Sequence, residues 1–488
     1  MLNVLGSSKR LRDGFTRREL IQAGAGAVVG LGLTGLTRTP ATAGGGTRPR
    51  HFGKAKSVMV LYLYGAMSQI DTLDPKPDAP AEIRGPFRSM ATKLPGVRLG
   101  EHLPLLADRL DRVTMVRSMN HPEPIHNVAN TVTGISRTDV PMELNQRHPR
   151  HWPFFGSVID YLETTQAGRA GDPLIPRNVI LPWRQSATAP DKRAGFFGGF
   201  LGSRYDPTPL EFRGKGTVQD CVEKFNPYCG VDPRDAYNFP ATDFGPQMTV
   251  DRFRARRGLL DELDDRQRYP AGTAPLQSFG ELQQIGLRLC DSATLPAALN
   301  LAREPAKLRE RYGHHLFGQS TLLGRRMIEA GSRVVTVLWD EFAANNSAWD
   351  THNNQTRRLG RELCPGFDRS VSALLDDLEQ RGLLDETLVV CLTEHGRTPQ
   401  AEGNGDGRNH WSGAYSIMLA GAGVARGNVV GSSDRQGAFV KTRPVNPKDI
   451  LHSIYHLLGI DVERSIPDRQ GRPMPLVDGG HLVPEILA

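Results

Sequence analysis

Cysteine is scarce in this chain of 488 residues. The five cysteines, Cys221, Cys229, Cys290, Cys364 and Cys391, are odd in number and unevenly spaced. They do not form a disulfide framework, although Cys221 and Cys229 could bridge locally in an oxidising compartment. The sequence also lacks a CxxC zinc pattern. Any bound metal ion would therefore have oxygen and imidazole ligands.

The chain also has only a small excess of positive charge. The formal net charge is +7, of which residues 1–43 carry +4 and the rest of the chain about +3. The later sequence has no long run of Lys and Arg with interleaved aromatic residues, which argues against a nucleic-acid partner. A hydrophobic content of 39% and a charged content of 23% are ordinary for a globular protein.

The N-terminal region lacks an apolar run long enough for a membrane span. Its stretch from Ala23 to Leu36 is shorter than the roughly 20 residues that a spanning helix needs. It follows a Thr16-Arg17-Arg18 motif and precedes Ala41-Thr42-Ala43, a layout typical of a cleaved twin-arginine export signal. We expect a signal peptide at 1–43, a linker at 44–56, no stable anchor after cleavage, and a periplasmic or extracellular protein. The alternative is an N-terminal membrane anchor.

Continuous apolar runs are present, and they predict buried strands. An amphipathic helix predicted at 355–381 separates two of these strands, and such a β-α-β step implies parallel pairing. A loop-rich insertion is expected at about 172–250, where short apolar pieces are broken by Gly and Pro. The predicted strands are 57–64, 113–118, 333–338, 387–392 and 415–420, and the other predicted helices are 127–133, 276–291, 295–312, 320–330 and 447–458.

Three of the predicted strands have acidic and histidine side chains beside them. Glu394 and His395 follow one strand, Asp350 and His352 lie in the loop after another, and His410 precedes a third. The carboxyl ends of parallel strands form the ligand crevice of an open α/β sheet, so these side chains can meet there. The pattern predicts a site for a divalent metal ion, namely zinc, calcium, magnesium or manganese. Taken alone, Glu394 and His395 would fit a polar turn better than a metal site.

Two further segments follow strands. Asp71 comes after the first strand and could be a metal ligand or part of a turn. His121 and His126 precede the short helix predicted at 127–133, whose N-terminus would suit an anion such as phosphate or sulfate. Taken singly, either histidine could be an ordinary surface residue.

Several of these motifs, in this order, resemble a known family. From about Val58 to the C-terminus the chain is similar to the sulfatase-like family known as domain of unknown function 1501, in the alkaline phosphatase and sulfatase superfamily. The resemblance implies a three-layer α/β/α sandwich with a central mostly parallel sheet, alkaline-phosphatase-like, as one domain at 57–488. It also implies metal ligands at Asp350, His352, Glu394, His395 and His410. The motifs that carry it are Tyr64 to Asp78, Trp349 to His352, Thr393 to Pro399, Asn409 to Trp411 and the helix from Pro447 to Ile460.

The chain departs from the superfamily pattern at two points. Gly65 stands where an Asp is expected directly after the first strand, so Asp71 is a shifted substitute. The Cys/Ser-x-Pro-x-Arg motif that matures to formylglycine is absent before Thr133-Gly134. Formylglycine chemistry is therefore not expected.

These features lead to a functional hypothesis of an exported metal-dependent hydrolase acting on phosphate or sulfate esters. Its substrate would be an anionic ester or a sulfated or phosphorylated carbohydrate. A metal-activated water or His126 would attack, and His121 would serve as acid or base. Arg397 would either clamp an anionic oxygen or fix its own loop. The alternative is a non-catalytic binding or surface-complex protein that keeps the hydrolase fold. The sequence does not indicate an oligomeric state.

Overall fold

The computed structural model describes residues 49–135, 145–165, 175–238, 294–343, 348–402 and 406–488, with isolated positions between 252 and 259. The predicted signal peptide at 1–43, the helix expected at 276–291 and Cys290 lie outside these residues. The chain divides into Met1–Pro49 and Arg50–Ala488, and the second unit is the one described below.

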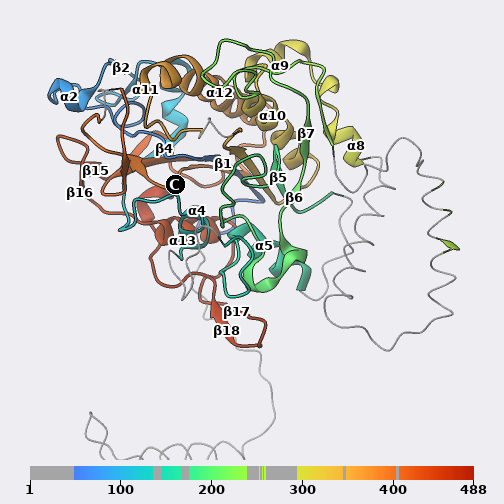
Figure 1. Ribbon diagram of the computed structural model, residues 1–488. Helices are drawn as coiled ribbons and strands as arrows, with labels where there is room; N and C mark the ends of the chain where they lie inside the picture. The colour runs from blue at the N-terminus through green and yellow to red at the C-terminus, as the bar shows by residue number, and fades with distance from the viewer. Residues whose placement is uncertain are drawn as a thin grey trace, which may run out of the picture. The chain divides into compact units, whose positions relative to one another are not determined.

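An eight-stranded sheet forms the centre of this unit, in the order β14-β4-β13-β10-β1-β9-β5-β6 (Figure 1). Strand β13 runs antiparallel to both of its neighbours, and all the other pairs are parallel. The predicted α/β fold with a mostly parallel sheet is confirmed. The strands are β1 (Ser57–Leu63), β4 (Val113–Met119), β5 (Asn178–Leu181), β6 (Thr208–Pro209), β9 (Val334–Trp339), β10 (Thr387–Leu392), β13 (Tyr415–Ala420) and β14 (Asn428–Val430).

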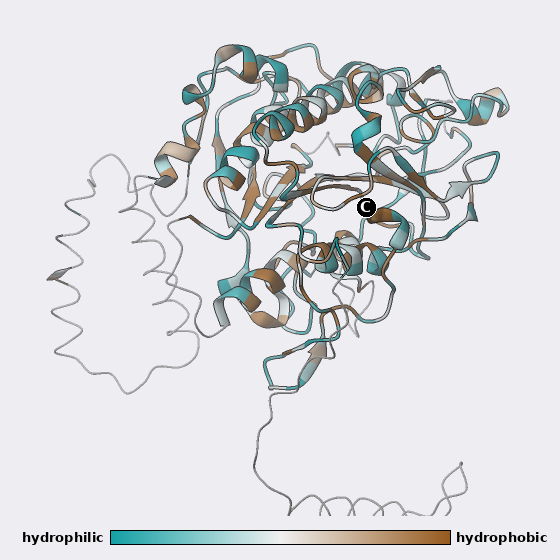
Figure 2. Ribbon diagram, turned by 180° about the vertical axis from the view of Figure 1, so that it is seen from behind, coloured by the Kyte–Doolittle hydropathy of each residue, from teal (hydrophilic) through white to brown (hydrophobic). Residues whose placement is uncertain are grey.

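The central strands are apolar at nearly every position because both faces of the sheet are covered. Every residue of β1, β9, β10 and β13 is buried. A strand buried on both faces has no solvent side to carry polar residues, which explains continuous rather than alternating apolar runs. Figure 2 shows these hydrophobic strands between layers of helices with hydrophilic outer faces.

Helices form one layer on each side of the sheet, which completes the predicted three-layer sandwich (Figure 1). Helix α13 begins with a capping box, in which Asn446 and Asp449 bind each other's backbone N–H groups, and with Pro447 at its first position. One layer has α9 (Ala306–Tyr312), α10 (Leu316–Glu329) and α12 (Cys364–Gln380), and the other has α4 (Val128–Thr133), α5 (Phe155–Thr165) and α13 (Pro447–Leu457).

Two predicted helices are interrupted, and proline contributes to both interruptions. The helix expected at 295–312 is divided into α8 (Thr294–Leu299), η5 (Leu301–Arg303) and α9, with Pro305 at the start of α9. The helix expected at 355–381 consists of α11 (Gln355–Arg357), a π-helical segment (Arg358–Leu363) and α12, whose second residue is Pro365. Proline has no N–H to donate to the preceding turn, so a regular α-helix is disrupted there.

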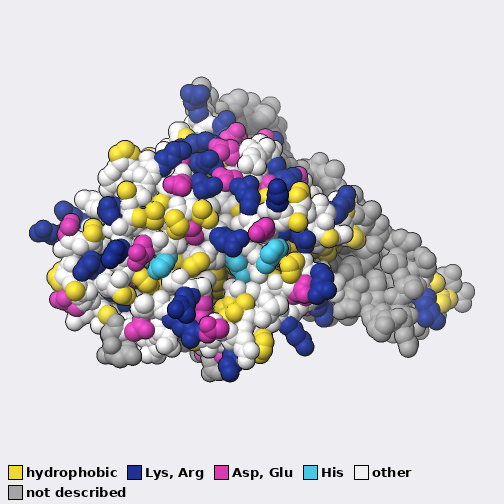
Figure 3. All heavy atoms as spheres, turned by 90° about the horizontal axis from the view of Figure 1, so that it is seen from above, with side chains coloured by type: hydrophobic (Ala, Val, Ile, Leu, Met, Phe, Trp, Pro, Cys, Tyr) yellow, Lys and Arg dark blue, Asp and Glu magenta, His cyan; other side chains and the backbone are white. Residues whose placement is uncertain are grey.

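Ion pairs join the helices of the first layer. Asp376 of α12 binds Arg109, Arg112 and Arg311, each at 2.6–2.7 Å. The fully buried Arg325 of α10 binds Asp377 at 2.8 Å. Basic and acidic side chains are interspersed on this face of the molecule (Figure 3). Charges thus connect α12 with α9, α10 and the segment before β4.

Part of the expected insertion at 172–250 belongs to the central sheet, because β5 and β6 form its edge beside β9. The rest of its described part is mostly loop, with the short pair β7 (Glu211–Arg213) and β8 (Ala236–Asn238). Other short pairs are β2 (Ser89–Ala91) with β3 (Arg98–Gly100), β11 (Gly396–Arg397) with β12 (His410–Trp411), β15 (Ser432–Ser433) with β16 (Val440–Thr442), and β17 (Ser465–Pro467) with β18 (Pro473–Pro475).

The strand directions decide where the loops meet. Strand β4 is antiparallel to β13, and β13 is antiparallel to β10, so β4 runs in the same direction as β10, β1 and β9. The loops that follow these four strands therefore leave the same edge of the sheet. Among the described residues, no helix has the length and apolar character of a membrane span.

Candidate metal centre

The loops at this edge bring together a cluster of four histidines and one aspartate. His126 lies between β4 and α4, Asp350 and His352 lie in the loop after β9, His395 follows β10, and His410 opens β12. We call these five residues the histidine cluster. They come from loops that are far apart in the sequence.

A short hairpin places His410 beside His395. Strands β11 and β12 pair antiparallel, with Arg397 opposite His410 and Gly396 opposite Trp411. The ring centroids of His395 and His410 are 4.8 Å apart. One candidate ligand, His395, therefore follows β10, and the other, His410, lies where the hairpin returns toward the sheet.

Close backbone contact holds the His352 loop against this hairpin. A Cβ at Gly407 would lie 1.8 Å from the carbonyl oxygen of His352, so the position has no room for a side chain. Arg408 N–H also donates to the carbonyl of Thr351 at 3.2 Å. Glycine therefore permits the approach that brings His352 and His410 together.

The nitrogen and oxygen atoms of the histidine cluster converge in two overlapping triads. One is His126, His395 and His410, and the other is Asp350, His352 and His410; within each triad the ligand atoms lie within 4.8 Å of one another. The Nε2 atoms of His352 and His410 are 3.0 Å apart, and Asp350 Oδ1 is 2.9 Å from His352 Nε2. Two ligands that each lie about 2.0–2.1 Å from one ion have separations of about this size.

In the first triad, each histidine uses Nδ1 for a hydrogen bond. The Nδ1 atoms of His126, His395 and His410 bind Glu394 Oε1, the Gly396 carbonyl and the Pro124 carbonyl at 2.8, 2.8 and 3.2 Å. These oxygens are acceptors, so Nδ1 carries the proton and Nε2 is left to face the cluster. Such fixing of the tautomer is typical of metal-binding histidines.

Buried polar atoms without hydrogen bonds support the fit of an ion. Among the described residues, His395 Nε2 has no hydrogen-bond partner, and neither has His126 Nε2, which lies 3.3 Å from Asp350 Oδ2 without hydrogen-bond geometry. A buried nitrogen without a partner costs free energy. A divalent ion with imidazole and carboxylate ligands would satisfy both atoms.

Glu394 lies behind His126, outside both triads. Its Oε1 accepts hydrogen bonds from the Gly65 backbone N–H at 2.7 Å and from His126 Nδ1. Gly65 has a φ of 100°, a conformation that favours glycine. At the position where an Asp was expected, the backbone of Gly65 thus holds the carboxylate. The structure places Glu394 as the residue that orients His126.

Burial and charge act in opposite directions on the histidines. Burial disfavours the charged form of His126, but Asp350 and Glu394 outweigh it and raise the pKa of His126 to about 9. Burial, followed by the charges of His126 and Arg397, lowers the pKa of His395 well below its usual value. His395 is therefore neutral, which is the form that binds metals. Metal binding would displace the extra proton of His126.

Asp350 is the acidic member of the cluster. Burial alone would raise its pKa, but the neighbouring imidazoles of His126, His352 and His410 and the charge of Arg397 hold the pKa far below the usual value. The cluster is open on the side of His352, whose side chain is 39% exposed, whereas His395 is fully buried. A ligand would therefore approach past His352.

Asp71 lies apart from the histidine cluster. Its carboxylate forms a fully buried ion pair with Arg408 Nε at 2.8 Å and accepts further hydrogen bonds from Ser68 and Gln355. It belongs to neither triad. The structure thus assigns Asp71 to a structural contact between the first loop and the hairpin region, in place of the predicted metal ligand.

Arg397 is fully buried beside the cluster, and its guanidinium is taken up by the protein. It donates to the carbonyls of Gly65, Ala66 and Arg408 and to Asp350. Of the two predicted roles, these contacts correspond to fixing the loop, because the donors that an anion would need already have acceptors.

His121 does not join the cluster either. Its Nε2 donates to the Glu394 carbonyl at 2.7 Å, and its Nδ1 accepts from the Glu123 backbone N–H at 3.3 Å. Burial lowers the pKa of His121. A neutral ring with both nitrogens bound to backbone groups positions Glu394, which differs from the predicted acid or base.

The sequence analysis did not single out Glu341, which follows β9 directly after Asp340. Among the described residues, its buried Oε2 has no hydrogen-bond partner. Burial, followed by the charge of Asp340, raises the pKa of Glu341 to about 7, and the charges of His126 and Asp350 also act on it. Its position directly after a buried strand was the sequence signal that could have marked Glu341 as an acidic residue near the site.

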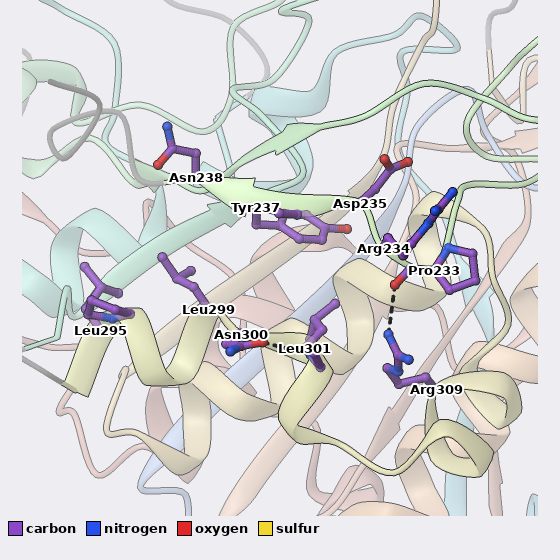
Figure 4. Close-up of a pocket in the computed structure, with 13 residues that line it drawn as sticks. Pro233, Arg234, Asp235, Tyr237, Asn238, Leu295, Leu299, Asn300, Leu301 and Arg309 are labelled. Atoms are coloured by element: carbon purple, nitrogen blue, oxygen red, sulfur yellow. Dashed lines mark hydrogen bonds between the residues drawn. The ribbon is translucent and has the colours of Figure 1, made fainter. Parts of the chain in front are cut away.

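A cavity lies elsewhere in the molecule. It has a volume of about 630 Å³ between β8 and the α8–α9 region, and its lining includes Tyr237, Leu295, Leu299 and Arg309 (Figure 4). Arg309 donates to the Pro233 carbonyl at 2.8 Å. No residue of the histidine cluster lines this cavity, so size alone does not identify the chemical site.

The fold and the cluster define an α/β/α sandwich protein with a candidate metal centre at the carboxyl ends of its parallel strands. Within this class, the chain belongs to the family described as Protein of unknown function (DUF1501), whose profile matches residues 55–487. No curated protein matches the sequence.

Several solved structures are similar in fold at low identity. Ps i-CgsB shares 12% identity, with 84% of this chain and 73% of that chain covered and a TM-score of 0.38. The lipoteichoic acid synthase LtaP from Listeria monocytogenes shares 9%, with 85% and 75% covered and a TM-score of 0.37. Phosphonate monoester hydrolase SpPMH from Silicibacter pomeroyi shares 15%, with 88% and 76% covered and a TM-score of 0.33. At these values none of them assigns an activity to this chain.

Proposed function

We propose that the protein is an exported metal-dependent hydrolase that cleaves phosphate or sulfate esters at the histidine cluster. One observation carries the metal site: His126, His395 and His410 each bind an acceptor through Nδ1 and turn Nε2 toward a common point. Asp350 adds a carboxylate to the same cluster. Three imidazoles with an open position form a common catalytic metal site.

A divalent ion bound there would act as a Lewis acid on an ester oxygen and lower the pKa of a water molecule. The protein's other residues hold the ligand side chains in place and orient them. Glu394, His121 and Arg397 fix the loops from behind, so that the cluster is rigid before a ligand arrives. His352, whose side chain is 39% exposed, lies beside Asp350 on the open side of the cluster.

The ester class is supported by the motif resemblance and by the chemistry of the cluster. A divalent cation in a cluster that is open on the side of His352 attracts an anionic oxygen, and a water nucleophile removes the need for a formylglycine. The twin-arginine motif supports export, which a fusion of residues 1–43 to a reporter protein would test. Retention of that reporter in the cytoplasm would contradict it.

The central experiment measures metal content and hydrolysis together. The full chain would be purified and its metal content measured, and aryl phosphates, phosphodiesters and aryl sulfates would be tested with and without chelator. We expect bound divalent metal in the wild type and chelator-sensitive hydrolysis of at least one ester class. His395→Ala and His410→Ala should lose both, whereas His481→Ala, an exposed histidine outside the cluster, should keep both.

The outcomes separate the two candidate functions. Less than about half an equivalent of any divalent metal per chain, in a protein that also fails to take up added metal, would refute the metal site. Bound metal without turnover of any ester would instead favour the non-catalytic binding protein. The metal stoichiometry distinguishes one ion shared by the two triads from one ion in each.

A further inference from the structure

A pair of cysteines lies in a closed loop outside the histidine cluster. The loop runs from Gly216 to Val231, which pair as an antiparallel bridge, and Thr217 N–H donates to the Gly230 carbonyl at 3.0 Å. Inside it, Phe225 N–H donates to the Val218 carbonyl at 2.9 Å. The chain is thus folded back on itself between Cys221 and Cys229.

This fold brings the two thiols to the same cavity. Cys221 and Cys229 are both free thiols, and they lie close enough for each side chain to act on the pKa of the other. Cys221 is 6% exposed, and both residues line a cavity of about 220 Å³. A small oxidant can therefore reach the pair through this cavity.

The surroundings do not indicate a metal site at the cysteines. Burial raises the pKa of both thiols, so exchange with an external disulfide, which begins with a thiolate, would be slow. His315 lines the same cavity. However, among the described residues the only groups of three converging ligand atoms lie in the histidine cluster, so Cys221, Cys229 and His315 do not form a metal site.

We propose that Cys221 and Cys229 are a disulfide-forming pair that closes this loop. Each thiol loses its proton and together they lose two electrons as the S–S bond forms. A low-molecular-weight disulfide such as oxidised glutathione accepts the two electrons and two protons and is released as two thiols. Of the other described cysteines, Cys364 and Cys391 are buried in the core.

The crosslink would stiffen contacts beside the metal centre. Val222 N–H donates to Glu362 Oε1 at 2.9 Å, and Asp220 binds Arg357 at 2.7 Å. Arg357 and Glu362 lie in α11 and the π-helical segment, which follow Asp350 and His352 in the chain. The disulfide therefore connects the redox state of the loop to the segment that carries two residues of the cluster.

Peptide mapping provides the test. The folded full chain would be equilibrated with oxidised glutathione or with dithiothreitol, quenched in acid, alkylated after denaturation and digested with trypsin. Trypsin cleaves after Lys224, between the two cysteines, so the disulfide yields two peptides linked through Cys221 and Cys229. We expect this species, about 2 Da lighter than the two reduced peptides together, only in the oxidised sample.

A thermal melt gives a second measurement. Closing a short loop in the unfolded chain should raise the Tm of the oxidised wild type by roughly 2–4 °C over the reduced protein. The Cys229→Ser variant should lose both the linked species and this difference. Two alkylated thiols in every oxidising buffer would overturn the proposal, as would linkage of either residue to Cys290 or to glutathione as the final product.

Discussion

His395 illustrates how single residues prepare the centre. Its Nδ1 donates to the next carbonyl in the chain, and its Nε2 is buried without a hydrogen bond among the described residues. Burial keeps the ring neutral. A buried nitrogen without a hydrogen bond is unfavourable until something binds it. The unbound protein therefore already carries the free-energy cost of holding His395 in a ligand geometry.

Glu394 should control metal affinity through His126. The Glu394→Gln substitution keeps the size of the side chain but removes the charge that faces His126 Nδ1. We expect metal affinity to fall roughly 10- to 100-fold, as for other residues that support a metal-binding histidine. Competition with a fluorescent metal chelator would measure it.

Glu386→Gln is the matched control for this prediction. Glu386 directly precedes β10, whereas Glu394 follows it, and the Glu386 side chain is 48% exposed in an ion pair with Lys56. Its substitution should leave metal affinity unchanged. Equal affinities for Glu394→Gln and the wild type would show that His126 needs no carboxylate behind it.

Which polar residues would meet was only partly predictable. His395, His410, Asp350 and His352 follow or precede strands whose order a β-α-β pattern suggests. Asp71 has the same sequence context, but its charge is neutralised by Arg408, 337 residues away. A sequence does not show such distant pairs, so it could not separate a ligand from a buried ion-pair partner. His126 was noticed, but its role as a ligand depends on Glu394.

At the scale of elements, the strands were the most predictable feature. Continuous apolar runs identified β1, β4, β9, β10 and β13 to within a residue or two at each end. The helices were less predictable where periodicity continued across a proline. Pro305 and Pro365 both lie inside amphipathic patterns that the sequence presents as single helices. The two-residue strands β11 and β12 are too short to have a pattern, although they position His410.

Helix α10 should make the stability of the fold depend on pH. Its N-cap residue, His315, accepts a hydrogen bond from Gly318 N–H at 3.2 Å, and burial lowers the pKa of His315 to about 3. An unfolded histidine has a pKa of about 6.5, so between these values the unfolded chain binds the proton more readily. The contribution of His315 is complete above pH 6.5 and is lost as the pH falls toward 3.

The His315→Asn variant tests this dependence, because Asn can cap the helix without titrating. At pH 5 protonation should cost the wild type about 2 kcal/mol of unfolding free energy that the variant does not lose. Urea denaturation between pH 7 and pH 4.5 would measure the difference. An identical pH slope in the two proteins would contradict the assignment, and His481→Asn should retain the wild-type slope.

At the scale of the whole molecule, the centre joins loops that follow three separate strands. The His126 loop follows β4, the Asp350 loop follows β9 and the His395 loop follows β10. An ion bound by all three would stabilise the arrangement of these strands, because binding to the folded state alone adds to the unfolding free energy. Metal and fold stability should therefore change together.

Chelation should lower the Tm of the wild-type protein. When free ion exceeds Kd by about 100-fold, the bound metal contributes about 2.7 kcal/mol, which the chelator would remove. Differential scanning calorimetry before and after chelation would measure the shift, and added metal should reverse it. The Tm of His395→Ala should be the same before and after chelation. If the wild type keeps both its Tm and its metal in chelator, the site releases the ion too slowly for the chelator to remove it.

The antiparallel strand β13 gives the centre two stages of assembly. His395 and His410 lie on one hairpin between β10 and β13, so their approach closes only a short loop of chain. His126, by contrast, is 268 residues from Glu394, and it arrives only when β4 pairs with β13. Closing a longer loop costs more entropy. During folding, the hairpin half of the centre can therefore form while the other half is still distant, and the ion would be captured tightly only by the chain that has completed its sheet.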